Sequence, residues 1–371
     1  YDNRTDALTG KFEKSNYYQL LNGTWKFFFA DSYKDLPANI TDPSISTDSW
    51  NDIKVPGNWE VQGYGVAIYT NHGYEFKPRN PQPPTLPEAN PVGVYRRDID
   101  IPADWKERDI YLHLAGAKSG VYVYINGQEV GYSEDSKNPA EFLINKYVKP
   151  GKNVLTLKIF RWSTGSYLEC QDFWRISGIE RDVYLYSQPK VAIKDFRITS
   201  TLDDTYKNGI FKLTMDIRNT GSQTSKDYII GYKVFDPKTN KVIAESEKNS
   251  AFNANSTISL FGHTEIEIPD VKTWTSEHPN LYKLLMYIKD GEKIVEMVPF
   301  NIGFRRIEIK PIEQKAANGQ PYVCLFINGQ PLKLKGVNIH EHNPATGHYV
   351  PEDLMRRDFE LMKRHNLNSV R

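Results

Sequence analysis

The chain has 371 residues, enough for about two or three domains with cores of their own. Its 47 Lys and Arg balance 46 Asp and Glu to a net charge of +1, so it lacks the basic surface that nucleic-acid binding requires. Hydrophobic and charged fractions of 39% and 25% exclude wholesale disorder, no apolar run reaches the roughly 20 residues of a membrane-spanning helix, and two cysteines are too few for a disulfide framework. The aromatic fraction of 13% is high, which favours strands and also suits surfaces that stack on sugars.

Residues 1–190 are predicted to form one aromatic-rich β domain, because six of the seven Trp lie there. Apolar residues alternate along 110–114, and the run 121–125 leads into Asn126-Gly127, a dipeptide typical of tight hairpin turns. Many short strands without a helical pattern between them predict a sandwich of the jelly-roll type. Prolines crowd the segment from Pro78 to Pro91, which predicts an extended, stiff loop. Further strands are predicted at 130–132, 154–160 and 182–186.

Residues 191–304 have a different pattern, since Trp almost disappears and strict alternation takes over. Along 211–217 the apolar residues Phe, Leu, Met and Ile occupy every second position, as in a strand with one buried face. About 110 residues of this kind predict an immunoglobulin-like sandwich, although no Cys-Trp-Cys pattern of an antibody domain is present. We expect this domain to act as a spacer. Other strands are predicted at 228–235, 282–288 and 294–300.

From residue 305 the pattern becomes mixed. Strands are predicted at 322–327 and 332–337, joined by Asn328-Gly329. Residues 351–365 have the capping charges and the apolar stripe of a helix with one buried face, and 367–371 resemble another strand. Strand, loop, helix and strand make one βα unit of a parallel-sheet fold, here predicted to be the start of an incomplete (β/α)8 barrel.

The segment 161–178 is dense in groups that bind sugars, namely carboxylates, guanidinium groups and aromatic rings. The residues alone also fit a packed loop with salt bridges, since carboxylate–Arg pairs are usually structural. Glu169 and Asp172 are a poor pair of glycosidase carboxylates, because residues three apart on one loop rarely face each other across a cleft. Residues 55–71 likewise combine amides with aromatic rings, which suits recognition of hydroxyl groups and also suits packing between loops.

The segment 336–344, GVNIHEHNP, directly follows the predicted apolar strand. At the C-terminal end of a first barrel strand its side chains would face the mouth of the barrel. His340 and His342 would then share one side and Glu341 the other, with His348 nearby. Three alternatives stay open at this point: hydrogen bonding of a substrate by His340, a zinc site, or ordinary packing.

Taken together, these segments resemble glycoside hydrolase family 2, and within it the large bacterial β-galactosidases. The resemblance covers nearly the whole chain and implies a jelly-roll sugar-binding domain (1–190), an immunoglobulin-like β-sandwich (191–304) and the start of a TIM-barrel catalytic domain (305–371). The motifs occur in the order of the family: LNGTWKF (21–27), VPGNWEVQGYGVAIYTN (55–71), GYSEDSKNPAEF (131–142), RWSTGSYLECQDFWRISGIERDV (161–183), GFRRIEI (303–309) and LKGVNIHEHNP (334–344).

The resemblance also implies site residues. The galactose-contacting Asn of the family falls on Asn71, its substrate-binding His on His340, and the Asp that touches both sugar and a sodium ion on Asp172. The site would be composite, with jelly-roll loops reaching the barrel mouth, and oxygen ligands such as Asp172 suit a hard cation. One departure is Ile339, which stands where β-galactosidases usually have a basic residue.

The implied activity is hydrolysis of terminal, non-reducing β-D-galactose by a retaining double displacement. The catalytic glutamates and the main Mg²⁺ ligands would lie beyond residue 371, so we expect no catalytic residue in this chain and no activity from it alone. The implied partner is a β-galactoside such as lactose or a galactose-terminated glycan, and the intact enzyme would be a homo-oligomer.

Two alternatives remain. One is a non-catalytic carbohydrate-binding protein, and the other is a different glycosidase of the same family, a β-glucuronidase or β-mannosidase. The chain opens with Tyr1-Asp2-Asn3, which indicates a processed or cut sequence, so bacterial cytoplasm and periplasm both stay open.

Overall fold

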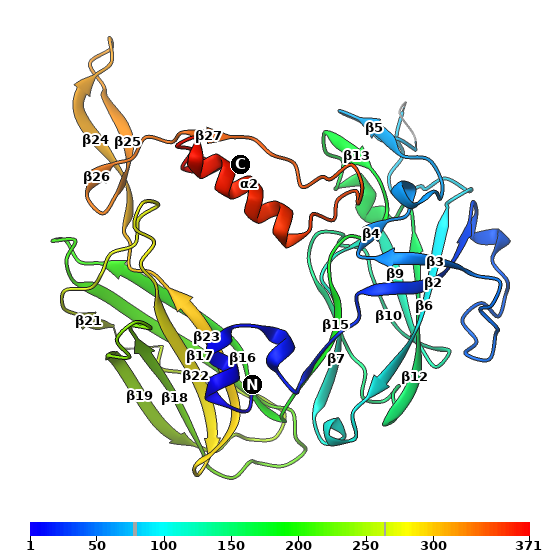
Figure 1. Cartoon of the computed structure of the whole chain (residues 1–371), viewed down its shortest axis with the longest axis horizontal. Coiled ribbons are helices and arrows are strands. Elements are labelled where there is room, and N and C mark those ends of the chain that lie inside the picture. The colour runs from blue at the N-terminus through cyan, green and yellow to red at the C-terminus, as the bar shows by residue number, and fades with distance from the viewer. Residues whose placement is uncertain (77–79, 263–264) are drawn as a thin grey trace. The chain divides into compact units, whose positions relative to one another are not determined.

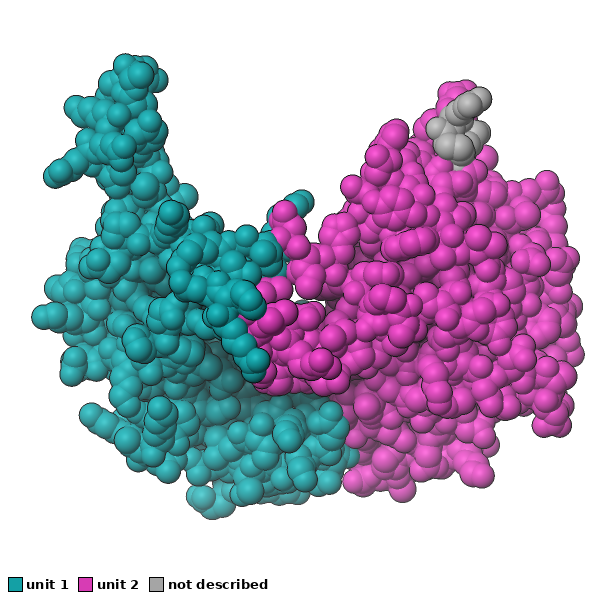
Figure 2. All heavy atoms as spheres, turned by 45° about the horizontal axis from the view of Figure 1, so that its top comes forward, with its two compact units in different colours: residues 1–16, 188–337, 363–371 teal, residues 17–187, 338–362 magenta. Residues whose placement is uncertain are grey.

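The computed structural model describes residues 1–76, 80–262 and 265–371. These residues separate into two compact units, shown in different colours in Figure 2. One comprises residues 17–187 with 338–362, and the other comprises residues 1–16, 188–337 and 363–371. The predicted proline-rich loop begins at Pro78, which lies outside the described residues.

Residues 17–187 form a sandwich of facing antiparallel sheets with the core between them (Figure 1). One sheet has the strand order β1-β15-β7-β11, and the facing sheet has the order β10-β9-β12-β6-β2-β3. Trp25, Trp59 and Trp105 are fully buried in this unit, which explains part of its high Trp content. The strands are β1 (Tyr18–Leu20), β2 (Gly23–Ala30), β3 (Asn51–Val55), β6 (Val92–Ile101), β7 (Asp109–Leu114), β9 (Gly120–Ile125), β10 (Gln128–Ser133), β11 (Ala140–Leu143), β12 (Gly151–Phe160) and β15 (Val183–Gln188).

The predicted hairpin at Asn126-Gly127 is confirmed, and it joins β9 to β10. Both residues have positive φ values, 51° and 81°, as a tight turn between twisted strands requires. Two shorter ladders, β4-β14-β8 and β5-β13, form sheets of their own, and the first adds Ala117 and Ile179 to the core. Their strands are β4 (Gly57–Asn58), β5 (Ile68–Thr70), β8 (Ala117–Lys118), β13 (Phe173–Arg175) and β14 (Gly178–Ile179), and 3₁₀ turns lie at Phe12–Lys14, Tyr33–Asp35, Glu60–Gln62, Ala103–Trp105 and Thr164–Tyr167.

The second sandwich begins at β16 and is immunoglobulin-like. One sheet has the order β16-β17-β20 with β21 also paired to β17, and the other has the order β19-β18-β22-β23. The predicted alternation along 211–217 is confirmed, because all four apolar residues are buried. The strands are β16 (Val191–Leu202), β17 (Gly209–Asn219), β18 (Tyr228–Phe235), β19 (Val242–Ser250), β20 (Ser256–Leu260), β21 (Ile266–Ile268), β22 (Tyr282–Asp290) and β23 (Lys293–Ile302).

A short helix that the sequence pattern did not predict, α1 (Arg4–Thr9), packs on this second sandwich. Asn3 caps it by accepting a hydrogen bond from the Asp6 amide. Its buried Ala7 lies in a small cluster with Phe235 and Met297. Residues 1–16 therefore group with the second sandwich rather than with the jelly roll.

Residues 307–370 contain a hairpin and one βα unit. In the hairpin β24 (Ile307–Lys315) pairs with β25 (Pro321–Ile327), which pairs with β26 (Gln330–Pro331). Then β27 (Gly336–Val337) pairs in parallel with β28 (Ser369–Val370), and α2 (Glu352–Arg364) lies between them in sequence (Figure 1). The predicted helix and the parallel βα unit are confirmed.

Two details of this region differ from the prediction. The predicted strand 332–337 is paired only at its last two residues. The apolar stripe of α2 is not buried, since Met355, Phe359 and Leu361 are between 39% and 55% exposed. A lone βα unit has no second layer to cover that stripe.

The chain is thus mainly β, with a jelly-roll sandwich, an immunoglobulin-like sandwich and the first βα unit of a barrel. None of the helices in the described part of the chain combines the length and apolar character needed to cross a membrane.

Candidate functional site

The short β5-β13 ladder brings two of the predicted site residues together (Figure 1). Thr70 pairs with Phe173 in antiparallel register, so the next residues, Asn71 and Asp172, stand opposite each other at this end of the ladder. Both are exposed. The Tyr69 hydroxyl donates a hydrogen bond of 2.7 Å to Asp172 Oδ1. This bond, together with burial and the negative charge of the carboxylate, raises the pKa of Tyr69.

The third predicted residue, His340, reaches the same ladder. Its ring lies edge-on to the Phe173 ring, with centroids 6.3 Å apart. The His342 ring lies nearly parallel to Trp174, with centroids 6.4 Å apart. Glu341 instead faces Arg181, 3.3 Å away. The segment 340–342 therefore runs beside β13, and the structure gathers Asn71, Asp172 and His340 around one ladder.

Behind this ladder lies a buried anchor that the sequence did not reveal. His348 Nδ1 lies 2.7 Å from Glu180 Oε1, and the His348 amide donates to Asn58 Oδ1 at 2.7 Å. The Asn58 amide group donates in turn to Glu180 Oε1 at 3.3 Å. The His348 ring stacks on Phe173 with centroids 4.7 Å apart. This anchor, defined as Asn58, Glu180 and His348, fastens the segment after GVNIHEHNP to the jelly roll.

The charges of the anchor follow from its surroundings. Burial disfavours the charged form of Glu180, but the His348 hydrogen bond and the nearby Lys137 and Lys118 ammonium groups outweigh it and lower the pKa of Glu180 to about 2. Burial also lowers the pKa of His348, although Glu180 opposes this. At neutral pH the pair is therefore a carboxylate and a neutral imidazole that donates from Nδ1. His348 Nε2 is buried and has no hydrogen-bond partner among the described residues.

The remaining carboxylates of the motif region have structural partners. Both oxygens of Glu169 accept hydrogen bonds from Ser136, at 2.8 Å from its amide and 2.6 Å from its hydroxyl. Glu169 thus links its own loop to the loop that contains Ser136. In the described part of the chain no group of three or more His, Cys, Asp or Glu side chains is placed to hold a metal ion. Asp172 supplies one oxygen ligand that suits a hard cation, but the described residues do not complete a cation site.

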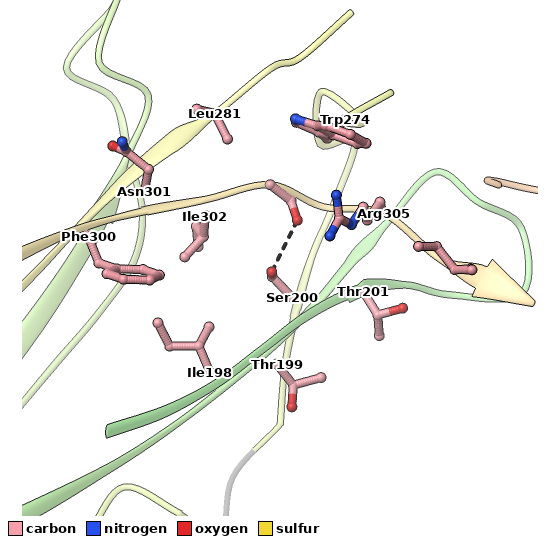
Figure 3. A pocket seen from close by; sticks show the side chains of 12 residues that line it. Ile198, Thr199, Ser200, Thr201, Trp274, Leu281, Phe300, Asn301, Ile302 and Arg305 are labelled. Carbon is pink, nitrogen blue, oxygen red and sulfur yellow. Dashed lines mark hydrogen bonds between the residues drawn. The ribbon is translucent and has the colours of Figure 1, made fainter. Parts of the chain in front are cut away.

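A separate cavity of about 560 Å³ lies in the immunoglobulin-like sandwich (Figure 3). The Arg305 guanidinium lies 4.5 Å from the centroid of the Trp274 ring there, and the Ser200 hydroxyl donates to the Gly303 carbonyl at 3.1 Å. The described residues that line it include no Asp, Glu or His and none of the predicted site residues. The described lining therefore offers no carboxylate or imidazole for acid–base chemistry.

Family comparisons agree with this architecture. Three models of the glycosyl hydrolases family 2 match in chain order: the sugar binding domain at residues 18–189, the family's second model at 191–305 and its TIM barrel domain at 323–371. A solved Bacteroides uniformis beta-glucuronidase has a TM-score of 0.77 at 21% identity, over 95% of this chain and 39% of that one. At this identity the likeness shows a shared fold.

Curated relatives are closer in sequence. A beta-galactosidase of Priestia megaterium is 39% identical over 100% of this chain and 35% of its own length. A beta-galactosidase of Psychromonas ingrahamii is 35% identical over 97% of this chain and 33% of its own length. The chain thus spans about a third of the length of the curated relatives it matches. From its domain order, its motifs and these relatives, the chain belongs to glycoside hydrolase family 2.

Proposed function

We propose that this chain is the substrate-binding part of a retaining β-galactosidase, in which Asn71, Asp172 and His340 hold a terminal β-D-galactose. The observation that supports this most directly is the β5-β13 ladder, which sets Asn71 opposite Asp172 and has His340 against Phe173. The curated relatives at 35–39% identity are beta-galactosidases, which favours galactose as the sugar.

In this proposal the residues of the chain bind and orient the sugar. An exposed amide, a carboxylate and an imidazole supply donors and acceptors for hydroxyl groups that lie in different directions. Tyr69 donates to Asp172 and so fixes the carboxylate, which leaves its other oxygen for a sugar hydroxyl. Fixing the sugar in this way lowers the entropic barrier to the chemical step.

Bond cleavage would depend on carboxyl groups outside this chain. A retaining mechanism needs an acid and a nucleophile about 5–5.5 Å apart, one to protonate the leaving oxygen and one to form the glycosyl-enzyme. The motif carboxylates Glu169, Asp172 and Glu341 each have a partner of their own, namely Ser136, Tyr69 and Arg181. We therefore propose that the 371-residue chain alone is inactive.

The proposal extends to ions and assembly. Asp172 would supply one oxygen ligand of a Na⁺ ion beside the sugar, and the main Mg²⁺ ligands would come from residues after 371. A β-galactoside such as lactose would be the substrate of the intact enzyme, which would be a homo-oligomer.

The test compares the encoded product that contains residues 1–371 with the 371-residue chain, on aryl β-galactoside, β-glucuronide and β-mannoside. We expect only the product to hydrolyse the galactoside, and Asp172→Asn to lower kcat/KM at least about a hundredfold, or about 3 kcal/mol. The matched control is Asp48→Asn, an exposed loop aspartate bonded to Ser46, which should change little. Turnover of the glucuronide or mannoside instead would refute the substrate, and no turnover by the product would favour a binding protein. Turnover by the chain alone would refute the placement of the catalytic carboxyls.

A further inference from the structure

The jelly-roll unit has a cavity of about 640 Å³ that contains none of the predicted site residues. It lies on the face of the β10-β9-β12 sheet that points away from the core. Val121, Val123 and Ile159 face the core, so their neighbours Tyr122 and Phe160 face the other way. A solvent-facing sheet surface ordinarily has polar side chains, and here it has aromatic rings.

The rings form a continuous floor. Tyr132 on β10 stands beside Tyr122 on β9, with ring centroids 4.5 Å apart, and Tyr122 meets Phe160 edge-on at 5.8 Å. Tyr33 meets Phe160 at 6.3 Å. Tyr33 and Tyr132 remain 45% and 44% exposed. Such a row of half-exposed rings is a large apolar surface kept in contact with water, and it is available for stacking.

The edge of this cavity is polar and acidic. Glu134 accepts hydrogen bonds from the Tyr132 hydroxyl at 3.1 Å, the Thr164 hydroxyl at 2.6 Å and the Gly165 amide at 3.3 Å. Burial opposes ionisation of Glu134, but these bonds outweigh it and lower its pKa. Glu88 adds a second carboxylate, paired with Lys34, which lies outside the lining. None of the described residues that line the cavity is Lys or Arg.

We propose that this cavity binds a neutral oligosaccharide, with sugar rings stacked on Tyr33 and Tyr132 and sugar hydroxyls bonded to Glu134 and Thr164. A pyranose has apolar C–H faces and a rim of hydroxyls, and this cavity offers an aromatic floor with a hydrogen-bonding edge. Glu134 and Glu88 make the edge acidic, which disfavours anionic sugars. Of the neighbouring cations, Lys34 pairs with Glu88 and Lys158 lies 5.6 Å from the Tyr122 ring centroid. The volume lies within the range of about 300–1,000 Å³ typical of ligand sites.

This site binds without cleaving and is independent of the site around Asp172. The ligand class therefore includes glycans that are not galactosides. A glycan bound in this cavity keeps its other sugar units at high local concentration around the protein that binds it.

Two tryptophans report the two sites separately in ¹H–¹⁵N spectra of the 371-residue chain. Trp162 lines this cavity and donates from its indole to Glu75, whereas Trp174 lies on the β5-β13 ladder. Titration with lactose, cellobiose and maltotriose should shift the Trp162 indole signal saturably with at least one of them. A glucuronic-acid disaccharide should shift it less at equal concentration.

Variants complete the test. Tyr33→Ala with Tyr132→Ala should weaken the Trp162 response at least about tenfold. Glu134→Gln keeps the shape of the edge and should also weaken the response, so the test does not depend on the Ala variant alone. Tyr322→Ala, at a tyrosine 47% exposed elsewhere, should leave it unchanged.

The inference is overturned if no neutral sugar shifts Trp162, if both cavity variants bind like the wild type, or if the acidic sugar binds as tightly. Asp172→Asn should leave the Trp162 response intact. The two proposals can thus fail independently.

Discussion

Replacing Glu180 by Gln is expected to loosen the segment around His348 and leave the sandwich core folded. The pKa of Glu180 is about 2 in the fold against an ordinary value of 4.5, a difference of about 2.5. Each pKa unit corresponds to about 1.4 kcal/mol, so the charge contributes about 3 kcal/mol at pH 7. Because the pKa is lowered by folding, this contribution is complete above pH 4.5 and is lost as the pH falls from 4.5 towards 2.

The assay is hydrogen–deuterium exchange at the His348 amide, which donates to Asn58 inside the anchor. A loss of about 3 kcal/mol should speed this exchange about a hundredfold at pH 7 if opening is local. The control is Glu341→Gln on the same segment, which removes an exposed ion pair with Arg181 and should cost less than about 1 kcal/mol. Equal exchange rates at the His348 amide in wild type and Glu180→Gln would refute the reasoning, because the Glu180 charge would then not stabilise this segment.

Two further predictions concern buried or crowded positions. Burial raises the pKa of Glu60 to about 7 despite Arg161 at 3.8 Å, so its contribution to stability is complete below pH 4.5 and is lost as the pH rises through 7. Urea unfolding should show that the stability of Glu60→Gln relative to wild type rises by about 2.5 kcal/mol between pH 5 and pH 8, and an equal difference at both pH values would contradict this. Gly347 has φ +75°, and an added Cβ would lie 2.3 Å from Asn58 Oδ1, whereas Gly319 has φ +81° and open space. Thermal unfolding should therefore show a larger loss of stability for Gly347→Ala than for Gly319→Ala. The Gly319 variant should lose only the backbone strain of about 1–2 kcal/mol. Equal losses in the two variants would contradict the predicted clash with Asn58.

Local chemistry determines the parts of the fold that were predictable. Asn126-Gly127 and Asn328-Gly329 adopt the positive φ values that such turns need, so the hairpins could be placed without tertiary information. The helix at α2 was likewise evident from its period, but its burial was not, since burial depends on a partner layer. The sequence pattern does not predict the short α1, because its six residues are too few to show a helical period.

The candidate site was predictable only through resemblance, because its geometry is non-local. Asn71 and Asp172 are 101 positions apart, and only the register of β5 with β13 sets them opposite each other. Glu180 and His348 are 168 positions apart, and no spacing rule connects a lone glutamate with a distant histidine. The sequence places His348 near His340, but only the fold shows its partner Glu180.

The β5-β13 ladder is separate from both core sheets of the jelly roll. Substitutions on it leave the main hydrophobic core untouched, so the residues proposed to contact a sugar can change with little cost to the folding of the domain. Selection can then exchange one sugar preference for another while the scaffold stays constant.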